Sequence, residues 1–156
     1  MKIWIDADNC SKKVMEIISR ASVRLKIKAV FVADRDINIT FSPFTEFIKV
    51  GRGDDSADLK ILELAEEGDI VITADIPLAA EVLEKNTVVI NPRGDLYTKQ
   101  MIKERLSMRN YMSNLRDIGI STGSGKKSDN IKKFSEVFDR ELTKSNKLSG
   151  DSLYEG

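Results

Sequence analysis

The sequence predicts an α/β fold, a three-layer α/β/α arrangement around a mostly parallel central sheet. Short continuous apolar runs, the pattern of strands buried on both faces, alternate with segments whose apolar residues recur at helical spacing. Such alternation is typical of a parallel sheet covered by helices on both faces. A chain of 156 residues with 41% hydrophobic residues can also bury a core without disulfide bonds.

The first half of the chain supplies three predicted strands and two predicted helices. Strands are expected at residues 2–5, 29–33 and 46–50, the third being the weakest. Residues 11–25 form a helix by apolar spacing, and residues 55–66 form a second one, with Leu59, Leu62 and Ala65 expected to face inward. Gly68 ends that helix, since glycine suits the left-handed cap.

The second half continues the alternation. Strands are expected at 69–73 and 87–90, a helix at 76–85 with Pro77 in its first turn, and a long helix from Thr98 to about Ile118. Residues 1–120 are therefore expected to form one α/β domain. Residues 121–156 are expected to form a flexible linker, one amphipathic helix around residues 131–142 and a frayed tail from Lys144.

The composition excludes several kinds of site. The chain has no histidine and one cysteine, Cys10, which excludes histidine general bases, Ser-His-Asp triads and zinc sites built from these residues. Any metal must bind oxygen ligands, which points to Mg²⁺ or Mn²⁺. The lone cysteine suggests a reducing compartment, and the apolar run before Asp6 is too short for a signal peptide. No run of about 18 apolar residues is present, so a cytoplasmic protein without a membrane partner is expected.

Aspartates follow the ends of predicted strands or open a predicted helix. They come from three segments: Asp6 and Asp8, then Asp54, Asp55 and Asp58, then Asp75. The carboxyl ends of parallel strands meet at one edge of a sheet, where ligands bind. Clustered carboxylates repel one another unless a cation is present, and divalent ions there can activate water against a phosphodiester.

The predicted catalytic set is Asp6, Asp8, Asp55, Asp58 and Asp75. Asp6, Asp55 and Asp75 are the first choices as metal ligands, whereas Asp8 and Asp58 would serve a second ion or metal-bound water. The alternative is structural, because Asp55 can cap a helix and Asp58 can complement its dipole.

Arginines line one side of the predicted 98–118 helix. Arg105, Arg109 and Arg116 fall within about 40° of one another and are flanked by apolar residues. Arginine in such a position needs carboxylate or phosphate partners. One interpretation is a substrate phosphate clamp, joined by Arg93; the other is a set of internal ion pairs that attach the helix to the sheet. Lys126, Lys127, Lys132 and Lys133 are expected to be solvated, with weak nucleic-acid contact as the alternative.

Several of these stretches resemble the bacterial YaiI/YqxD family. The resemblance is carried by residues 6–10, 53–58, 68–79 and 91–98, extends through 104–109 and 115–123, and covers about residues 1–123. That family is similar to PIN and NYN ribonuclease domains, with an acid after strand one, a pair opening a middle helix and another after a later strand. The resemblance implies a PIN-like, Mg²⁺- or Mn²⁺-dependent nuclease, with RNA favoured over DNA as partner. Asp54 is an extra acid, and Ser11 stands where the family usually has proline.

Two other functions stay open at this stage. The Asp6-x-Asp8 pair and residues 53–58 also resemble motifs of haloacid dehalogenase-type phosphatases, but clear Ser/Thr and Lys motifs are absent between them. A non-enzymatic binding module, for metal or nucleic acid, would instead pair the acids with a structural ion or with the arginines. Whether the acids converge on an open cleft or on arginine side chains distinguishes the nuclease from the binding module. The sequence predicts no oligomeric state.

Overall fold

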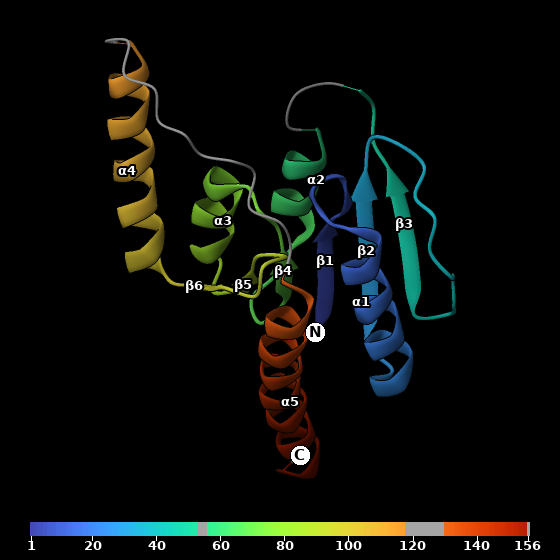
Figure 1. Cartoon of the computed structure of the whole chain (residues 1–156). Helices are drawn as coiled ribbons and strands as arrows, with labels where there is room; N and C mark the ends of the chain where they lie inside the picture. Colours follow the sequence, from blue (N-terminus) through green and yellow to red (C-terminus); the bar gives the residue numbers. More distant parts are fainter. Residues whose placement is uncertain (53–55, 118–129, 156) are drawn as a thin grey trace.

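A six-stranded sheet in the order β3-β2-β1-β4-β5-β6 forms the middle layer of the computed structural model (Figure 1). The structure describes residues 1–52, 56–117 and 130–155, with side chains for 1–52, 56–108 and 130–145. The strands are β1 (Lys2–Asp6), β2 (Lys28–Ala33), β3 (Thr45–Lys49), β4 (Ile70–Ile72), β5 (Val88–Ile90) and β6 (Leu96–Tyr97). Strands β1 to β5 pair in parallel, and β6 pairs antiparallel with β5. The predicted α/β fold with a mostly parallel sheet is confirmed.

Helices cover both faces of this sheet (Figure 1). They are α1 (Lys12–Leu25), α2 (Ser56–Leu64), α3 (Ile76–Leu83), α4 (Lys99–Asp117) and α5 (Ile131–Glu155), with a short 3₁₀ helix, η1 (Ala7–Asn9), after β1. Strand side chains alternate between the two faces, so that Ile3 and Ile5 pack with α1 and α5 while Trp4 packs with α2, α3 and α4. No helix in the described part of the chain is long and apolar enough to cross a membrane.

The strand order creates a switch point between β1 and β4. From β1 the chain moves outward through β2 to β3, then returns across the sheet to β4 on the other side of β1 and continues to β5. In doubly wound sheets, ligands bind outside the carboxyl ends of the strands at such a switch point. A ligand site is therefore expected at the carboxyl ends of β1 and β4, where the switch point lies.

Local caps explain where two of the helices begin. The Ser11 hydroxyl accepts a hydrogen bond from the Val14 N–H at 3.3 Å, and one Asp75 carboxylate oxygen accepts one from the Leu78 N–H at 2.9 Å. Pro77 lies in the first turn of α3, where no intrahelical N–H is needed.

The inward face of α2 differs from the prediction at Leu59. Ala57 and Ile61 are buried in the core, whereas Leu59 is 63% exposed. The spacing of three residues used in the prediction drifts around a helix of 3.6 residues per turn, whereas the spacing of four from Ala57 to Ile61 stays on one face. Leu59 instead lines a pocket at the protein surface. Leu62 lines the same pocket but also packs against the core, and Ala65 is buried as predicted.

Helix α5 is part of the main core, although its sequence lies beyond the predicted 1–120 domain. Phe134, Phe138 and Leu142 are buried with the side chains of β1, β2, β4 and β5. The two phenylalanine rings stack with centroids 5.2 Å apart. The backbone is helical to Glu155, where the sequence predicted a frayed tail from Lys144. The predicted linker lies outside the described residues.

Candidate functional site

Acidic residues lie along the carboxyl edge of the sheet, on either side of the switch point. Asp6 is the last residue of β1, and Asp75 follows β4, the neighbouring strand. Asp58 lies in the first turn of α2, the helix that returns the chain to β4. The strand order thus places three segments with predicted site residues along one edge.

Thr73 connects two of these acids. Its hydroxyl donates to Oδ2 of Asp6 at 3.0 Å and accepts a hydrogen bond from the backbone N–H of Asp75, also at 3.0 Å. The side-chain amide of Asn9 donates to the same Asp6 oxygen at 2.7 Å. Sequence reasoning did not assign roles to Thr73 or Asn9. The position of Thr73 at the end of the predicted 69–73 strand, two residues before Asp75, is the signal that could have found it.

The environment of Asp6 disfavours its charge. The side chain is 1% exposed, and burial is the main reason that its pKa is raised above the ordinary value; repulsion from Asp8 and Asp75 adds to the effect. The hydrogen bonds from Asn9 and Thr73 oppose this shift without cancelling it. A cation beside Asp6 would stabilise the ionised carboxylate and relieve the repulsion.

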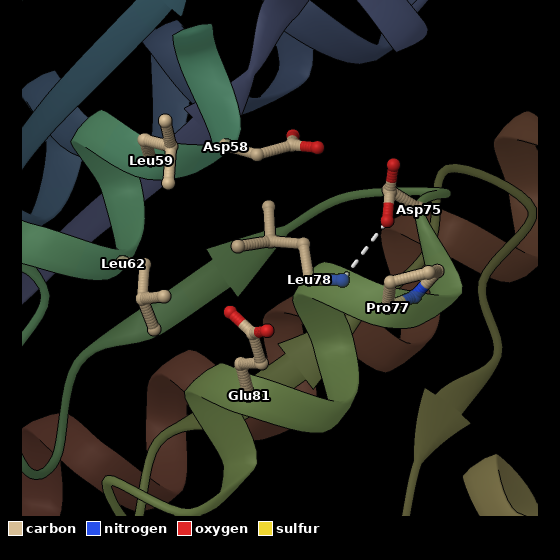
Figure 2. A pocket seen from close by; sticks show the side chains of 7 residues that line it. All are labelled: Asp58, Leu59, Leu62, Asp75, Pro77, Leu78 and Glu81. Carbon is tan, nitrogen blue, oxygen red and sulfur yellow. Dashed lines mark hydrogen bonds between the residues drawn. The ribbon is translucent and has the colours of Figure 1, made fainter. Parts of the chain in front are cut away.

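Asp58 and Asp75 lie at one end of a pocket between α2 and α3. Figure 2 shows their carboxylates extending from the two helices into the same region, and the pocket has a volume of about 340 Å³. Its other walls are Leu59, Leu62, Pro77, Leu78 and Glu81. Asp75 also caps α3 through its hydrogen bond to the Leu78 N–H, which holds its carboxylate in place. This pocket gives a ligand access to two of the predicted carboxylates.

Asp8 is held on the opposite side of Asp6, toward β2. Its Oδ2 accepts the backbone N–H of Asp34 at 3.0 Å, and its Oδ1 accepts Nε of Arg35 at 3.0 Å. Both partners follow the carboxyl end of β2. A second pocket of about 240 Å³, lined in part by Asp8, Cys10 and Arg35, lies there. The Asp8 carboxylate therefore already has a cationic partner.

The predicted acids are brought together only in part. Asp6 and Asp75 share Thr73, and Asp58 shares a pocket with Asp75, whereas Asp54 and Asp55 lie outside the described residues. Across the ranges that are described, no group of three or more His, Cys, Asp or Glu side chains is arranged to hold a metal ion. The five-aspartate catalytic set and its metal ligands stay predictions.

The predicted arginines divide into two pairs. Arg105 contacts Asp95 at 3.4 Å and lies over the Tyr97 ring at 5.4 Å, and Nε of Arg93 lies 3.9 Å from the same Asp95 oxygen. The side chains of Arg109 and Arg116 lie outside the described residues. The internal ion pair that the sequence analysis left open is thus present for Arg105. Phosphate binding by the four arginines stays a prediction.

Comparisons with known proteins find relatives over nearly the whole chain. Residues 4–144 match the model of a family described as "Uncharacterized BCR, YaiI/YqxD family". A UPF0178 protein of Maridesulfovibrio salexigens is 48% identical over 93% of this chain and 97% of its own length. A UPF0178 protein of Myxococcus xanthus is 42% identical over 92% and 95%, and one of Shewanella halifaxensis is 44% identical over 96% and 100%. No solved structure matches the chain.

Proposed function

The chain belongs to the YaiI/YqxD family, and from that premise and the acidic edge of its sheet we propose that it is a Mg²⁺- or Mn²⁺-dependent nuclease that hydrolyses phosphodiester bonds in RNA in preference to DNA. The names of these relatives state no activity, substrate or metal. The proposal therefore depends on the site itself and on the similarity of the family to PIN and NYN domains, which is an analogy at the level of fold.

One observation carries the proposal: a buried carboxylate with a raised pKa lies at the switch point of the sheet, connected through Thr73 to a second aspartate beside an open pocket. Asp6 is held in one orientation by two hydrogen bonds, and Asp75 by its capping bond. Perturbed carboxylates in such positions are characteristic of functional sites.

The residues at this edge fit a small divalent cation. Mg²⁺ is commonly bound through one or two carboxylates and keeps several water molecules, so it does not require a cage of protein ligands. Asp6 and Asp75 provide hard oxygen atoms. Burial, with added repulsion from Asp8 and Asp75, raises the pKa of Asp6, and a bound cation would favour its ionised form. A bound ion would supply Lewis acidity toward a phosphoryl oxygen and a lower pKa for the attacking water.

The chain's own residues then divide the remaining work. Asp6, Asp55 and Asp75 would be the metal ligands, with Thr73 and Asn9 orienting Asp6. Asp8 and Asp58 would hold a second ion or orient water. The pocket beside Asp58 and Asp75 leaves room for part of the substrate next to the carboxylates.

A binding module without catalysis is the second candidate. The pairing of Asp8 with Arg35 favours it, since a neutralised carboxylate has less need of a metal ion. The two candidates differ in whether metal binding through Asp6 and Asp75 is accompanied by cleavage.

The test is calorimetric titration of Mn²⁺ and Mg²⁺ into the wild type and the Asp6→Asn and Asp75→Asn variants, followed by cleavage of single-stranded RNA and DNA. In Asp6→Asn, the asparagine oxygen can still accept the hydrogen bonds that Asp6 receives. In Asp75→Asn, the asparagine can still cap α3. Asp139→Asn, an exposed acid on α5, is the matched control. Binding and cleavage that both variants lose, and the control retains, would support the proposal. An unchanged cleavage rate in Asp6→Asn would refute it, whereas metal binding without cleavage would favour the binding module.

A further inference from the structure

The carboxylate of Asp95 is shared by three cations from three parts of the chain, here called the Asp95 cation cluster. Nζ of Lys133, in α5, lies 2.6 Å from Oδ1; a guanidinium nitrogen of Arg105, in α4, lies 3.4 Å from Oδ2; and Nε of Arg93 lies 3.9 Å from Oδ2. Three positive charges and one negative charge leave a net charge of +2. The pKa of Asp95 is lowered, mainly by the hydrogen bond from Lys133, so its charge is present at neutral pH.

The excess positive charge is accessible to a ligand. The side chains of Arg93, Arg105 and Lys133 are 29%, 36% and 51% exposed. A guanidinium carries five N–H donors and an ammonium group three, so one carboxylate cannot satisfy the cluster. Phosphate complements such a set of donors, because its oxygens accept charge-assisted hydrogen bonds from arginine in pairs.

The cluster lies next to the acidic edge of the sheet. Asp95 belongs to the loop that follows β5, and the backbone N–H of Thr73 donates to the carbonyl oxygen of Ile90, the last residue of β5, at 3.2 Å. Thr73 is the residue that connects Asp6 with Asp75. The segment with the acids and the segment that leads into the cluster are therefore hydrogen-bonded neighbours.

We infer that the Asp95 cation cluster binds a phosphate group of the substrate's nucleic-acid backbone, other than the phosphate that is cleaved. This inference rests on the proposed function, since its ligand is the substrate strand. It adds Lys133 to the predicted arginines, in place of the solvated role that the sequence suggested for this lysine. The Asp95 carboxylate offsets one of the three positive charges and leaves the outer donors of the cations free of it.

The test measures binding of a labelled single-stranded RNA oligomer by fluorescence anisotropy, in EDTA so that no metal-dependent cleavage occurs. Lys133→Gln should weaken binding roughly tenfold, the value of one strong charged contact, and should reduce the slope of log affinity against log salt by about 0.7. Lys132→Gln is the matched control, since Lys132 is an exposed neighbour in the same helix and the variant loses the same charge. Equal effects of the two variants would overturn the inference.

Asp95→Asn separates phosphate binding from a purely structural role. This variant raises the net charge of the cluster from +2 to +3, so RNA affinity should stay equal or increase, provided that the melting curve shows a folded protein. Affinity that falls as much as in Lys133→Gln would mean that the ion pairs serve only to hold the loop and α5 together. Absence of RNA binding by the wild type would also overturn the inference. The proposed nuclease activity is decided separately, by the dependence of cleavage on Asp6.

Discussion

The close packing of α5 on the 91–95 loop can be tested by comparing the stability of two variants, Gly94→Ala and Gly68→Ala. Both have positive φ angles of similar size, 91° and 86°. A Cβ atom at Gly94 would lie 2.6 Å from the carbonyl carbon of Lys133 and 2.6 Å from the backbone nitrogen of Phe134, whereas one at Gly68 would have nothing within 4 Å. Replacing each glycine with alanine thus imposes the same backbone strain, but only Gly94→Ala creates a steric clash.

The expected magnitudes follow from this difference. Left-handed backbone costs a residue with a Cβ about 1–2 kcal/mol, and the lower entropy of the unfolded alanine chain offsets about 0.4–1 kcal/mol. Gly68→Ala should therefore lower the free energy of unfolding by about 1 kcal/mol. Gly94→Ala should cost about 2 kcal/mol more, the middle of the range for overpacking, because the contacted atoms are backbone of α5 and cannot simply rotate away.

Thermal unfolding followed by circular dichroism provides the assay. For a chain of this length, 1 kcal/mol corresponds to about 2–4 °C, so Gly94→Ala should melt about 4–8 °C below Gly68→Ala. Equal melting temperatures for the two variants would refute the close packing of α5 on the loop. Since Lys133 is the residue that the added Cβ meets, Gly94→Ala should also weaken RNA binding if the cluster binds phosphate.

Three further predictions concern the charge and the core. Because the pKa of Asp6 is raised, the native state holds a proton at pH values where the unfolded state has released it, so stability falls as pH rises from the ordinary value of 3.8 through the raised one. In EDTA, Asp6→Asn should accordingly melt higher than the wild type at neutral pH, with a difference that shrinks in acid; a variant that melts lower at neutral pH would contradict the buried, uncompensated charge. Trp4→Phe should lower the free energy of unfolding, measured in urea, by about 2 kcal/mol, because it removes the 2.9 Å hydrogen bond from Nε1 to buried Asp69. The backbone N–H groups of Lys2 and Glu66 also donate to Asp69. An unchanged free energy of unfolding would indicate that the Trp4 bond adds nothing beyond these two. Phe138→Ala should cost about 3–5 kcal/mol in the same assay, and a cost below 1 kcal/mol would show that α5 is not part of the core.

Much of the site could be predicted because its residues occupy defined positions relative to local elements. Asp6 ends a strand and Asp75 precedes a helix that contains an early proline, and both features are visible within a few residues of sequence. The pairing of Asp8 with Arg35 and of Arg105 with Asp95 could not be predicted, since each depends on how two elements approach each other. The exposure of Leu59 likewise depends on which side of α2 meets the sheet.

The sequence by itself determined the alternation of strands and helices, the oxygen-only chemistry open to a metal ion, and the position of acids after strands. These properties are local, because hydrophobic period, caps and residue type act over one or two turns of chain. Only the tertiary structure decided that β4 lies beside β1, which brings Thr73 to Asp6 across 67 residues, and that α5 returns Lys133 to Asp95 across 38. Contacts at such separations depend on how whole elements bury their apolar faces against the sheet, and that choice is made by the packing of the entire core.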